Sequence, residues 1–285
     1  MRLLVFGRRG QLAQEIARLA PSAIFLGRDV ADLEEPATVT EAIRRHRPDG
    51  IVNAAAYTDV DRAESEPGRA MRINAAAPDA MARAAALMDI PLVQVSTDYV
   101  FDGSGSSPRS PAAYAVPVNA YGLSKAEGEE AVRAAGGTHA ILRTGWVFSP
   151  QGRNFVRTVL RLAETHRALR IVSDQVGGPT PASALAAATL EIVRQLREAP
   201  EKSGTYHFTG APDVSWADFA RAILAEAGLS VPVEDIPTAA YPTPARRPLN
   251  SRLDCRTTAE VFGISRPDWR AGLATTLDQL LVKEF

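Results

Sequence analysis

The sequence predicts an α/β protein built on a doubly wound parallel sheet, with a smaller, partly discontinuous C-terminal domain. Short apolar runs rich in β-branched residues alternate with amphipathic, Ala- and Leu-rich stretches through the first half of the chain. These runs are continuously apolar, as is typical of parallel strands that are covered on both faces. A Gly-rich turn, Gly7 to Gly10, joins the first run directly to the first helical stretch. Together the three observations favour a Rossmann-type architecture.

The first half of the chain contains the clearest strand and helix patterns. Short apolar runs bounded by polar or turn residues predict strands at Leu3–Phe6, Ala23–Leu26, Gly50–Asn53, Leu92–Ser96 and Ala140–Thr144. The helical period of apolar residues predicts helices at Gln11–Leu19, Pro36–Arg47, Glu66–Met88 and Ala120–Ala135.

The alternation loosens after about Ser149. Prolines gather at Gly178–Pro181 and between Pro237 and Pro248. Helical patterns remain at Phe155–Thr165, Ala182–Arg197 and Ser215–Ala227. Proline-containing connectors between fewer helices are typical of a second, smaller unit. We therefore expect a doubly wound domain at residues 1–148, to which the segment at about 170–200 returns, and a second domain at residues 149–285.

Composition excludes several classes of protein. The formal net charge of −1 provides no field that would attract nucleic acid or an anionic membrane. No stretch approaches the roughly 18 apolar residues of a membrane helix, and the apolar run after Arg2 is too short for a signal peptide. The single cysteine, Cys255, excludes an internal disulfide, and the four histidines have no metal-ligand spacing. We expect a cytoplasmic protein without a metal site.

The turn after the first strand has the spacing Gly-x-x-Gly-x-x-Ala. Gly7 permits the tight turn, Gly10 lets a phosphate approach the backbone, and Ala13 allows the helix to pack closely on the strand. The amide groups in the first turn of the helix then face the pyrophosphate of a dinucleotide. Glycines at such a turn can also be purely steric, so the motif by itself indicates a nucleotide site only weakly.

The residues after the second strand bear on the choice of cofactor. Enzymes that use NAD usually present an acid to the adenosine ribose at this point. Here the cation Arg28 precedes Asp29, and Arg8 and Arg9 lie in the neighbouring turn. Guanidinium groups bind a 2′-phosphate in bidentate fashion. We therefore predict NADPH in preference to NADH, the alternative being that these arginines are solvated surface charges.

Three polar residues, taken in order along the chain, indicate carbonyl reduction. Thr97 follows the fourth strand, and Tyr121 and Lys125 lie four residues apart in a predicted helix, so that both side chains point from one face. Reduction of a ketone needs a proton at oxygen, and a lysine ammonium can lower the pKa of the phenol that supplies it. Thr97 can donate to the same oxygen. The alternative is a half-buried aromatic beside a surface lysine, four apart by chance.

Longer motifs run along the rest of the chain. The general dehydrogenase motifs are Gly7–Leu12, Val52–Thr58, Asp61–Glu64, Ser96–Gly103 and Tyr121–Lys125. The more specific motifs are Leu142–Val147, Asp174–Thr180 and Pro242–Ser251. In these stretches the chain resembles the dTDP-4-dehydrorhamnose reductases, within the extended short-chain dehydrogenases. The resemblance covers nearly the whole chain, and its specific motifs separate this family from epimerases and dehydratases of the same fold.

The resemblance implies reduction of the 4-keto group of dTDP-4-dehydro-β-L-rhamnose to dTDP-β-L-rhamnose by hydride transfer from NAD(P)H, the last step in making that sugar donor. It implies Tyr121 as the proton donor, Lys125 as its activator and ribose anchor, and Thr97 as a donor to the carbonyl oxygen. Further cofactor contacts are implied at Gly10, Gln11, Leu12, Asp32, Leu33, Ala56, Tyr57 and Thr58, and sugar contacts at Asp98 and Trp146. Residues 1–148 then bind mainly the dinucleotide, and residues 149–285 mainly the nucleotide-sugar substrate.

Several alternatives stay open from the sequence. Trp146 either fills the core or forms a platform for a sugar face, and Arg246 and Arg247 either hold the substrate diphosphate or join a surface ion network. The substrate could be another nucleotide-linked 4-keto-6-deoxy sugar, since a few contacts decide between related sugars. A non-catalytic regulatory subunit of methionine adenosyltransferase is a further interpretation, against which the intact catalytic set argues.

Some relatives form homodimers around a magnesium ion that is held by glutamates. Glu15 matches one such position, whereas the predicted helix from Ala182 has no carboxylate before Glu191. The sequence therefore leaves a magnesium-linked homodimer open.

Overall fold

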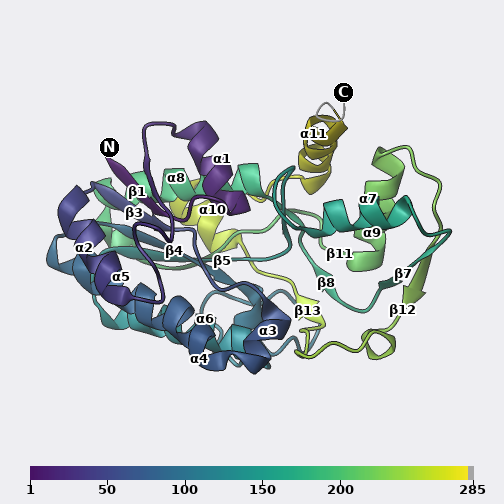
Figure 1. The fold of residues 1–285 in the computed structure, drawn as a ribbon, viewed down its shortest axis with the longest axis horizontal. Coiled ribbons are helices and arrows are strands. Elements are labelled where there is room, and N and C mark those ends of the chain that lie inside the picture. The colour runs from purple at the N-terminus through teal and green to yellow at the C-terminus, as the bar shows by residue number, and fades with distance from the viewer. Residues whose placement is uncertain (282–285) are drawn as a thin grey trace.

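Six parallel strands form the central sheet of the computed structural model, which describes residues 1–281 (Figure 1). In spatial order they are β10 (Gly204–His207), β5 (His139–Thr144), β4 (Leu92–Thr97), β3 (Gly50–Asn53), β1 (Leu3–Phe6) and β2 (Ile24–Leu26). The strand order reverses between β1 and β3, and ligands of doubly wound proteins bind beside such a reversal, at the carboxyl ends of the strands. The predicted fold class is confirmed, and the five predicted strands lie within one residue of their expected bounds.

Alternate strand residues form two cores, one on each face of the sheet. The first core includes Leu4, Phe6, Ile51, Leu92 and Ile141, and the second includes Leu3, Val5, Val52, Val93 and Leu142. The first is covered by α2 (Pro36–His46), α5 (Ala77–Leu87) and α6 (Ala120–Ala134), and the second by α1 (Gln11–Leu19) and α8 (Ala182–Glu198). Burial on both faces is the physical reason why these strands read as continuous apolar runs.

The edge strand β10 is not indicated by the sequence pattern. Its four residues include a glycine, a threonine and a histidine, so no apolar run marks it. The strand pairs in parallel with β5, which places Tyr206 beside Leu142 and His207 beside Arg143. Both side chains are buried there. Tertiary pairing therefore creates a strand that local propensity does not predict.

The helix predicted at Glu66–Met88 is confirmed in extent, because the chain is helical without a break from Pro67 to Leu87, but it contains a π-helical turn that was not predicted. The segment follows α3 (Val60–Ser65) and consists of α4 (Pro67–Met71), a π-helical turn at Arg72–Ala76, and α5. A π turn holds one more residue than an α turn, and apolar periodicity cannot reveal the extra residue. The insertion brings the buried Asn74 against the loop after β3, whose backbone it binds.

Apart from α8, β10 and residues 256–262, which pack on the central sheet, most of the chain beyond β5 builds a second part of the molecule, at the right in Figure 1. Its core lies between α7 (Phe155–Ala163), α9 (Trp216–Glu226) and α11 (Trp269–Leu281). The elements of the whole described chain that are not yet named are β6 (Val147–Phe148), β7 (Leu169–Val172), β8 (Val176–Gly177), β9 (Thr180–Pro181), β11 (Val214–Ser215), β12 (Val233–Ile236), β13 (Asn250–Ser251), α10 (Arg256–Phe262) and 3-10 turns at Asp98–Val100, Pro200–Lys202 and Thr238–Ala240. The predicted helices are confirmed in α7, α8 and α9, within two residues of their expected bounds. Among residues 1–281, no helix combines the length and apolar character needed to cross a membrane.

Candidate active site

A cleft of about 950 Å³ opens at the carboxyl ends of β1, β2 and β3, beside the reversal in strand order. Its lining includes most of the predicted cofactor residues, namely Gly7, Gly10, Arg28, Asp32, Leu33, Ala56, Tyr57 and Thr58. A cleft of this size is ample for a large ligand, since ligand pockets usually have volumes of about 300–1,000 Å³. Loops that follow three different strands thus meet around one cleft.

The turn between β1 and α1 has the geometry of a phosphate-binding loop. Gly7 has φ +114°, and a Cβ placed there would lie 3.4 Å from the backbone of Ala54, so this position favours glycine. Gly10 is the N-cap of α1 and provides no side-chain cap for the first turn of the helix. The first-turn amides remain available to an anion, and the helix dipole favours negative charge at the same point.

Gln11 and Leu12 lie in this first turn, but their side chains do not line the cleft. The Gln11 amide accepts hydrogen bonds of 2.9 Å from both Ser149 and Asn154, which ties α1 to the segment after β6. Leu12 is buried in the core beneath α1. Any contact of these two residues with a pyrophosphate is therefore made by the backbone.

Exposed arginines surround the end of the cleft beside β2. Arg8 lies 3.4 Å from Asp29, and Arg28 lies 3.9 Å from Asp32, with both arginine side chains about half or more exposed. Exposed pairs with such spacing contribute little to stability, so the guanidinium groups can reorient at low cost. Arg9 also lines the cleft. This end of the cleft can accept an anionic group.

The helix α6 carries the predicted catalytic pair on its buried face. Its N-cap, Asn119, accepts a 2.7 Å hydrogen bond from the N–H of Gly122, which fixes where the helix begins. Tyr121 and Lys125 follow one helical turn apart, and both are buried. The Lys125 ammonium donates a 2.7 Å hydrogen bond to the carbonyl of Val95 in β4. The pair thus packs against the end of β4, where Thr97 lies.

The pKa values of this pair differ from the shift that the sequence argument expects. Burial raises the pKa of the Tyr121 phenol to about 12, although the Thr97 hydroxyl beside it acts in the opposite direction. Burial lowers the pKa of Lys125 to about 8, while the negative charge of Glu129 opposes that change. The expected lowering of the phenol pKa by Lys125 is thus not seen, because loss of hydration dominates for both groups.

A buried ion pair, which the sequence analysis missed, lies one turn beyond Lys125. Glu129 receives hydrogen bonds of 2.8 and 2.6 Å from Arg143 of β5, 2.6 Å from Ser96 and 2.8 Å from Arg133. These donors lower the pKa of Glu129 against the effect of burial. The i, i+4 spacing of Lys125 and Glu129 in the sequence indicates that Glu129 lies near the catalytic lysine, but only the fold shows that Glu129 is buried.

Asp98 is a buried carboxylate next to Thr97. The Thr97 hydroxyl donates a 3.0 Å hydrogen bond to its Oδ1, whereas its buried Oδ2 has no hydrogen-bond partner within residues 1–281. Burial raises the pKa of Asp98 to about 6, and hydroxyls of Ser251 and Thr97 lower it. A Cβ on Gly145 would lie 2.8 Å from the Asp98 carboxylate, so the chain after β5 passes close to it. An unpaired carboxylate oxygen at a strand end is suited to accept a ligand hydroxyl.

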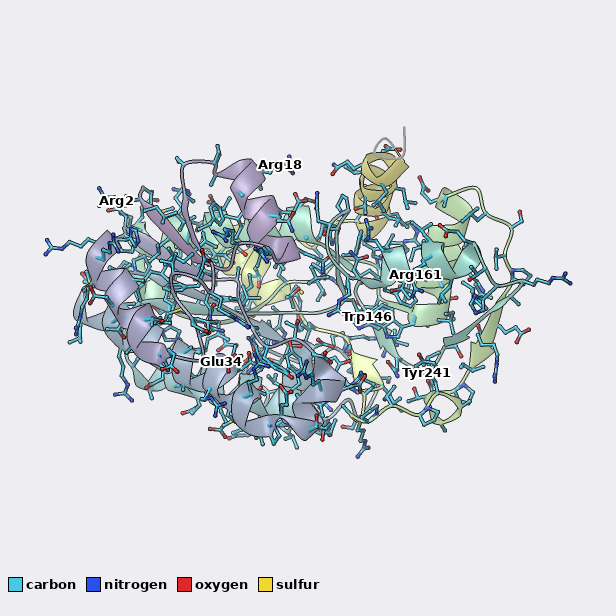
Figure 2. All side chains as sticks on the ribbon, viewed as in Figure 1. Arg2, Arg18, Glu34, Trp146, Arg161 and Tyr241 are labelled. Carbon is cyan, nitrogen blue, oxygen red and sulfur yellow. The ribbon has the colours of Figure 1, made fainter. Side chains whose placement is uncertain are left out.

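Trp146 lies where the two parts of the molecule meet (Figure 2). Its backbone has φ +52°, a strained conformation for a tryptophan, and its indole stacks on that of Trp216 with centroids 3.4 Å apart. Gly177 allows the close approach of the indole edge, because a Cβ there would lie 2.9 Å from it. Trp146 is thus partly buried against the core of the second part, and its side chain is held in one orientation.

The two predicted arginines of the 242–251 motif have different surroundings. Arg247 forms a 2.8 Å ion pair with Asp61 of α3. Arg246 is exposed and lines a second cavity of about 660 Å³, between the 102–104 loop and the 238–249 segment, together with Tyr241. Both arginines line this cavity, but Arg247 is engaged in an ion pair that joins the two parts of the molecule, whereas Arg246 is exposed.

Asn74 is a further buried polar residue that the sequence analysis did not single out. Its amide binds both the N–H and the C=O of Tyr57, at 2.8 and 3.0 Å, and donates to the Ser124 hydroxyl at 2.9 Å. The Ser124 hydroxyl in turn donates to the carbonyl of Tyr121. Asn74 thus connects the stretch beside the cleft with the helix that carries the catalytic pair. In the sequence, the only sign of this role is that Asn74 is a polar residue within an apolar helical pattern.

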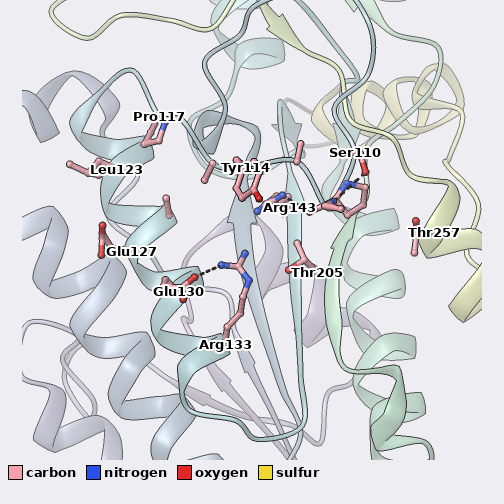
Figure 3. Close-up of a pocket in the computed structure, with 15 residues that line it drawn as sticks. Ser110, Tyr114, Pro117, Leu123, Glu127, Glu130, Arg133, Arg143, Thr205 and Thr257 are labelled. Carbon is pink, nitrogen blue, oxygen red and sulfur yellow. Dashed lines mark hydrogen bonds and ion pairs between the residues drawn. The ribbon is translucent and has the colours of Figure 1, made fainter.

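A third cavity, of about 770 Å³, lies on the face of α6 that is opposite to the face carrying Tyr121 and Lys125 (Figure 3). The 110–117 loop and the side chains of Leu123, Glu127, Glu130 and Arg133 line it, and none of the predicted site residues does. Glu15, which matches a magnesium position of some relatives, is buried and pairs with Arg18 at 3.1 Å. Within residues 1–281, no group of three His, Cys, Asp or Glu side chains is placed to hold a metal ion.

A doubly wound sheet, a glycine-lined phosphate turn and a Tyr-x-x-x-Lys helix beside a strand-end threonine define the short-chain dehydrogenase class. Residues 1–282 match the model of the RmlD substrate binding domain family. The chain is 42% identical to a dTDP-4-dehydrorhamnose reductase of Sinorhizobium fredii, with 99% of each protein covered. It is 43% identical to that of Burkholderia thailandensis, again over 99% of each.

Solved structures of dTDP-4-dehydrorhamnose reductases are also similar to this chain. A dTDP-4-dehydrorhamnose reductase of Clostridium acetobutylicum superposes with a TM-score of 0.91 at 34% identity, covering 99% of this chain and 100% of that one. The Bacillus anthracis enzyme, in complex with NADP, superposes with a TM-score of 0.90 at 31% identity, covering 98% and 99%. The chain belongs to the dTDP-4-dehydrorhamnose reductase family.

Proposed function

We propose that this protein reduces the 4-keto group of dTDP-4-dehydro-β-L-rhamnose to the hydroxyl of dTDP-β-L-rhamnose. The observation that carries the proposal is the burial of Thr97, Tyr121 and Lys125 together at the end of β4 in a chain that matches reductases of this name over 99% of its length. The reduction of a ketone requires both a hydride and a proton, and this set of side chains is suited to supply the proton.

The cleft residues fit a dinucleotide. Gly7 and Gly10 leave room for a pyrophosphate beside uncapped helix amides. Asp32 and Leu33 would contact the adenosine, the stretch from Ala56 to Thr58 would lie beside the nicotinamide, and Lys125 would hold its ribose. When bound, the reduced nicotinamide supplies the hydride. The exposed guanidinium groups of Arg8, Arg9 and Arg28 favour NADPH over NADH, and a relative was crystallised with NADP.

The protein's own groups place the ketone and move the proton. With substrate bound, the Thr97 hydroxyl would turn its one proton from Asp98 to the ketone oxygen. The Tyr121 phenol donates to the same oxygen and releases its proton as negative charge develops there. Its high pKa keeps the phenol protonated at neutral pH, ready to act as the acid. The Lys125 ammonium stabilises the phenolate that remains, and this replaces part of the stabilisation that burial removes.

Other residues would orient the nucleotide sugar. The free Oδ2 of Asp98 accepts a sugar hydroxyl, and the Trp146 indole packs against a sugar face. Arg246, in the second cavity, would bind the diphosphate. We further infer a cytoplasmic enzyme, in agreement with a substrate and a reduced cofactor of the cell interior.

The test is an assay of the purified full chain with NADPH and dTDP-4-dehydro-β-L-rhamnose, in which loss of the absorbance of the reduced cofactor is followed and the product is identified by chromatography. We expect dTDP-β-L-rhamnose in amounts equal to the NADPH consumed. A parallel assay uses other nucleotide-linked 4-keto-6-deoxy sugars. Faster turnover of one of these would change the substrate, and no turnover of any ketone would exclude a reductase.

A further inference from the structure

A chain of charged and polar side chains crosses the rim of the cofactor cleft. Arg69 of α4 donates to Oε1 of Glu34, in the loop after β2, with distances of 3.0 Å from Nε and 2.7 Å from Nη2. Its Nη1 lies 3.3 Å from Oε2 of Glu66. The same Glu66 oxygen accepts a 3.0 Å hydrogen bond from the Tyr57 hydroxyl. These four residues, which we call the rim clasp, join three separate segments of the chain.

Each end of the rim clasp is tied to a predicted cofactor contact. The N–H of Glu34 donates a 3.0 Å hydrogen bond to the carboxylate of Asp32, which lines the cleft at its adenosine end. At the other end, Tyr57 lines the cleft and has its backbone fixed by Asn74. Arg69 thus connects the two loops that would contact opposite halves of a dinucleotide.

The rim clasp is partly buried and electrically balanced. The side chains of Arg69, Glu34 and Glu66 are 30%, 24% and 26% exposed. Arg62 adds a second cation, 2.6 Å from Glu66. Hydrogen bonds from Arg62, Tyr57 and Arg69 lower the pKa of Glu66, so its carboxylate stays ionised at neutral pH. Two arginines facing two glutamates have no net charge, so the cluster itself does not attract a phosphate.

We propose that Arg69 is a positioning residue for the dinucleotide, which sets the spacing between the Asp32 loop and the Tyr57 stretch by holding Glu34 and Glu66 together. It acts on the width of the cleft and does not contact the 2′-phosphate. The inference rests on the proposed function in one respect only, namely that the cleft binds a nicotinamide dinucleotide.

The first test measures the Kd of NADPH and of NADH for the full chain by cofactor fluorescence, without any sugar. For Arg69→Ala we expect both Kd values to rise by the same factor of about five, the effect of losing a partly exposed ion network. With saturating cofactor, kcat should stay within about two-fold, because the reacting groups are unchanged. Arg69→Lys should give an intermediate Kd, since a lysine cannot replace the two-pronged guanidinium contact.

The matched control is Arg83→Ala. Arg83 lies on α5, pairs with Asp79 of the same helix at 2.8 Å and does not line the cleft. Its removal also takes away an arginine with one helical ion pair, and we expect unchanged Kd values for both cofactors. A rise equal to that of Arg69→Ala would show a general charge effect and would overturn the proposal.

Glu34→Gln is a second test variant, in which Arg69 itself is unchanged. If the rim clasp positions the dinucleotide, Glu34→Gln should bind both cofactors more weakly, by similar factors. If Arg69 instead bound the 2′-phosphate, Arg69→Ala would weaken NADPH alone, and Glu34→Gln would tighten NADPH by freeing the guanidinium; either pattern overturns the positioning role. Unchanged Kd values in both variants would also overturn the positioning role of Arg69, but they would leave the proposed function intact. Failure of the unaltered protein to bind either cofactor would overturn both.

Discussion

The ammonium nitrogen of Lys125 in α6 donates a 2.7 Å hydrogen bond to the carbonyl oxygen of Val95 in β4. This bond joins the helix that carries the proton donor to the strand whose end carries Thr97. Burial at this contact also lowers the pKa of Lys125 to about 8, which brings the loss of its proton close to neutral pH. The positive charge of the site therefore depends on pH in a range where enzymes are easily assayed.

The first prediction concerns the alkaline side of the pH profile. Because Lys125 loses its proton at about pH 8, whereas Tyr121 has a pKa of about 12, kcat/KM for ketone reduction should fall above about pH 8. Glu129 is the charged group that opposes this loss. Lys125→Arg, whose charge persists, should remove the fall at pH 8, although its basal rate is lower. An unchanged alkaline limb in that variant would assign the titration to another group.

The second prediction is that Tyr121→Phe lowers kcat by a factor of about 10² to 10⁴, the usual contribution of a positioned general acid. Cofactor Kd should change by less than about two-fold, since the ring and the helix remain. Tyr206→Phe is the control, because it removes another buried phenol, bonded to the Lys202 carbonyl far from the cleft. Full turnover in Tyr121→Phe would exclude this phenol as the proton donor.

The third prediction concerns Asp98, whose pKa of about 6 lies above its ordinary value of 3.8. Between these values the folded state keeps a proton that the unfolded state loses, so stability falls as pH rises through about 4 to 6. Asp98→Asn should therefore raise the free energy of unfolding at pH 7 by about 1–3 kcal/mol, and the gain should vanish near pH 4. Urea unfolding at several pH values measures this, with Glu127→Gln, an exposed position, as the control. A gain that does not depend on pH would contradict the assigned burial of charge.

The fourth prediction is that Arg28→Ala raises the KM for NADPH by about ten-fold and that for NADH by less than two-fold, since one charge-assisted contact to the 2′-phosphate is lost. Initial rates with each cofactor, at saturating sugar, measure the ratio. Arg44→Ala, on the exposed side of α2, should leave both KM values unchanged. Equal effects of Arg28→Ala on the two cofactors would remove the reason for preferring NADPH.

The fifth prediction concerns the contact between α6 and the π-helical turn. A Cβ on Gly128 would lie 2.0 Å from the backbone carbonyl oxygen of Asn74, so Gly128→Ala must separate the two helices. We expect a loss of about 2–4 kcal/mol in the free energy of unfolding, because the clash is with backbone that cannot rotate away. Gly68→Ala is the control: its Cβ meets nothing closer than 4.0 Å, and alanine favours a helix there. Equal unfolding midpoints for the two variants would show that the helices separate easily.

Much of the fold and part of the candidate site follow from local pattern. Strands β1 to β5 are continuous apolar runs, and both the glycine turn after β1 and the i, i+4 spacing of Tyr121 and Lys125 are readable without a structure. Such features depend on residues close together in the sequence, so periodicity and turn chemistry reveal them. The interruption at Arg72–Ala76 was missed, because an extra residue in a turn leaves the apolar period almost unchanged.

By itself, the sequence determined the doubly wound sheet, the phosphate turn and the order of the catalytic residues along the chain. Only the tertiary structure decided that β10 joins the sheet, that Glu129 pairs with Arg143 in the interior, and that Arg69 connects Glu34 with Glu66 across the cleft. Glu129 and Arg143 are 14 residues apart, Glu34 and Arg69 are 35 apart, and the paired residues of β5 and β10 are 64 apart, so these contacts depend on which surfaces the folded chain brings together. Burial likewise reversed the expected pKa shift of Tyr121, because loss of hydration is a property of the packed interior and not of the helix that carries the residue.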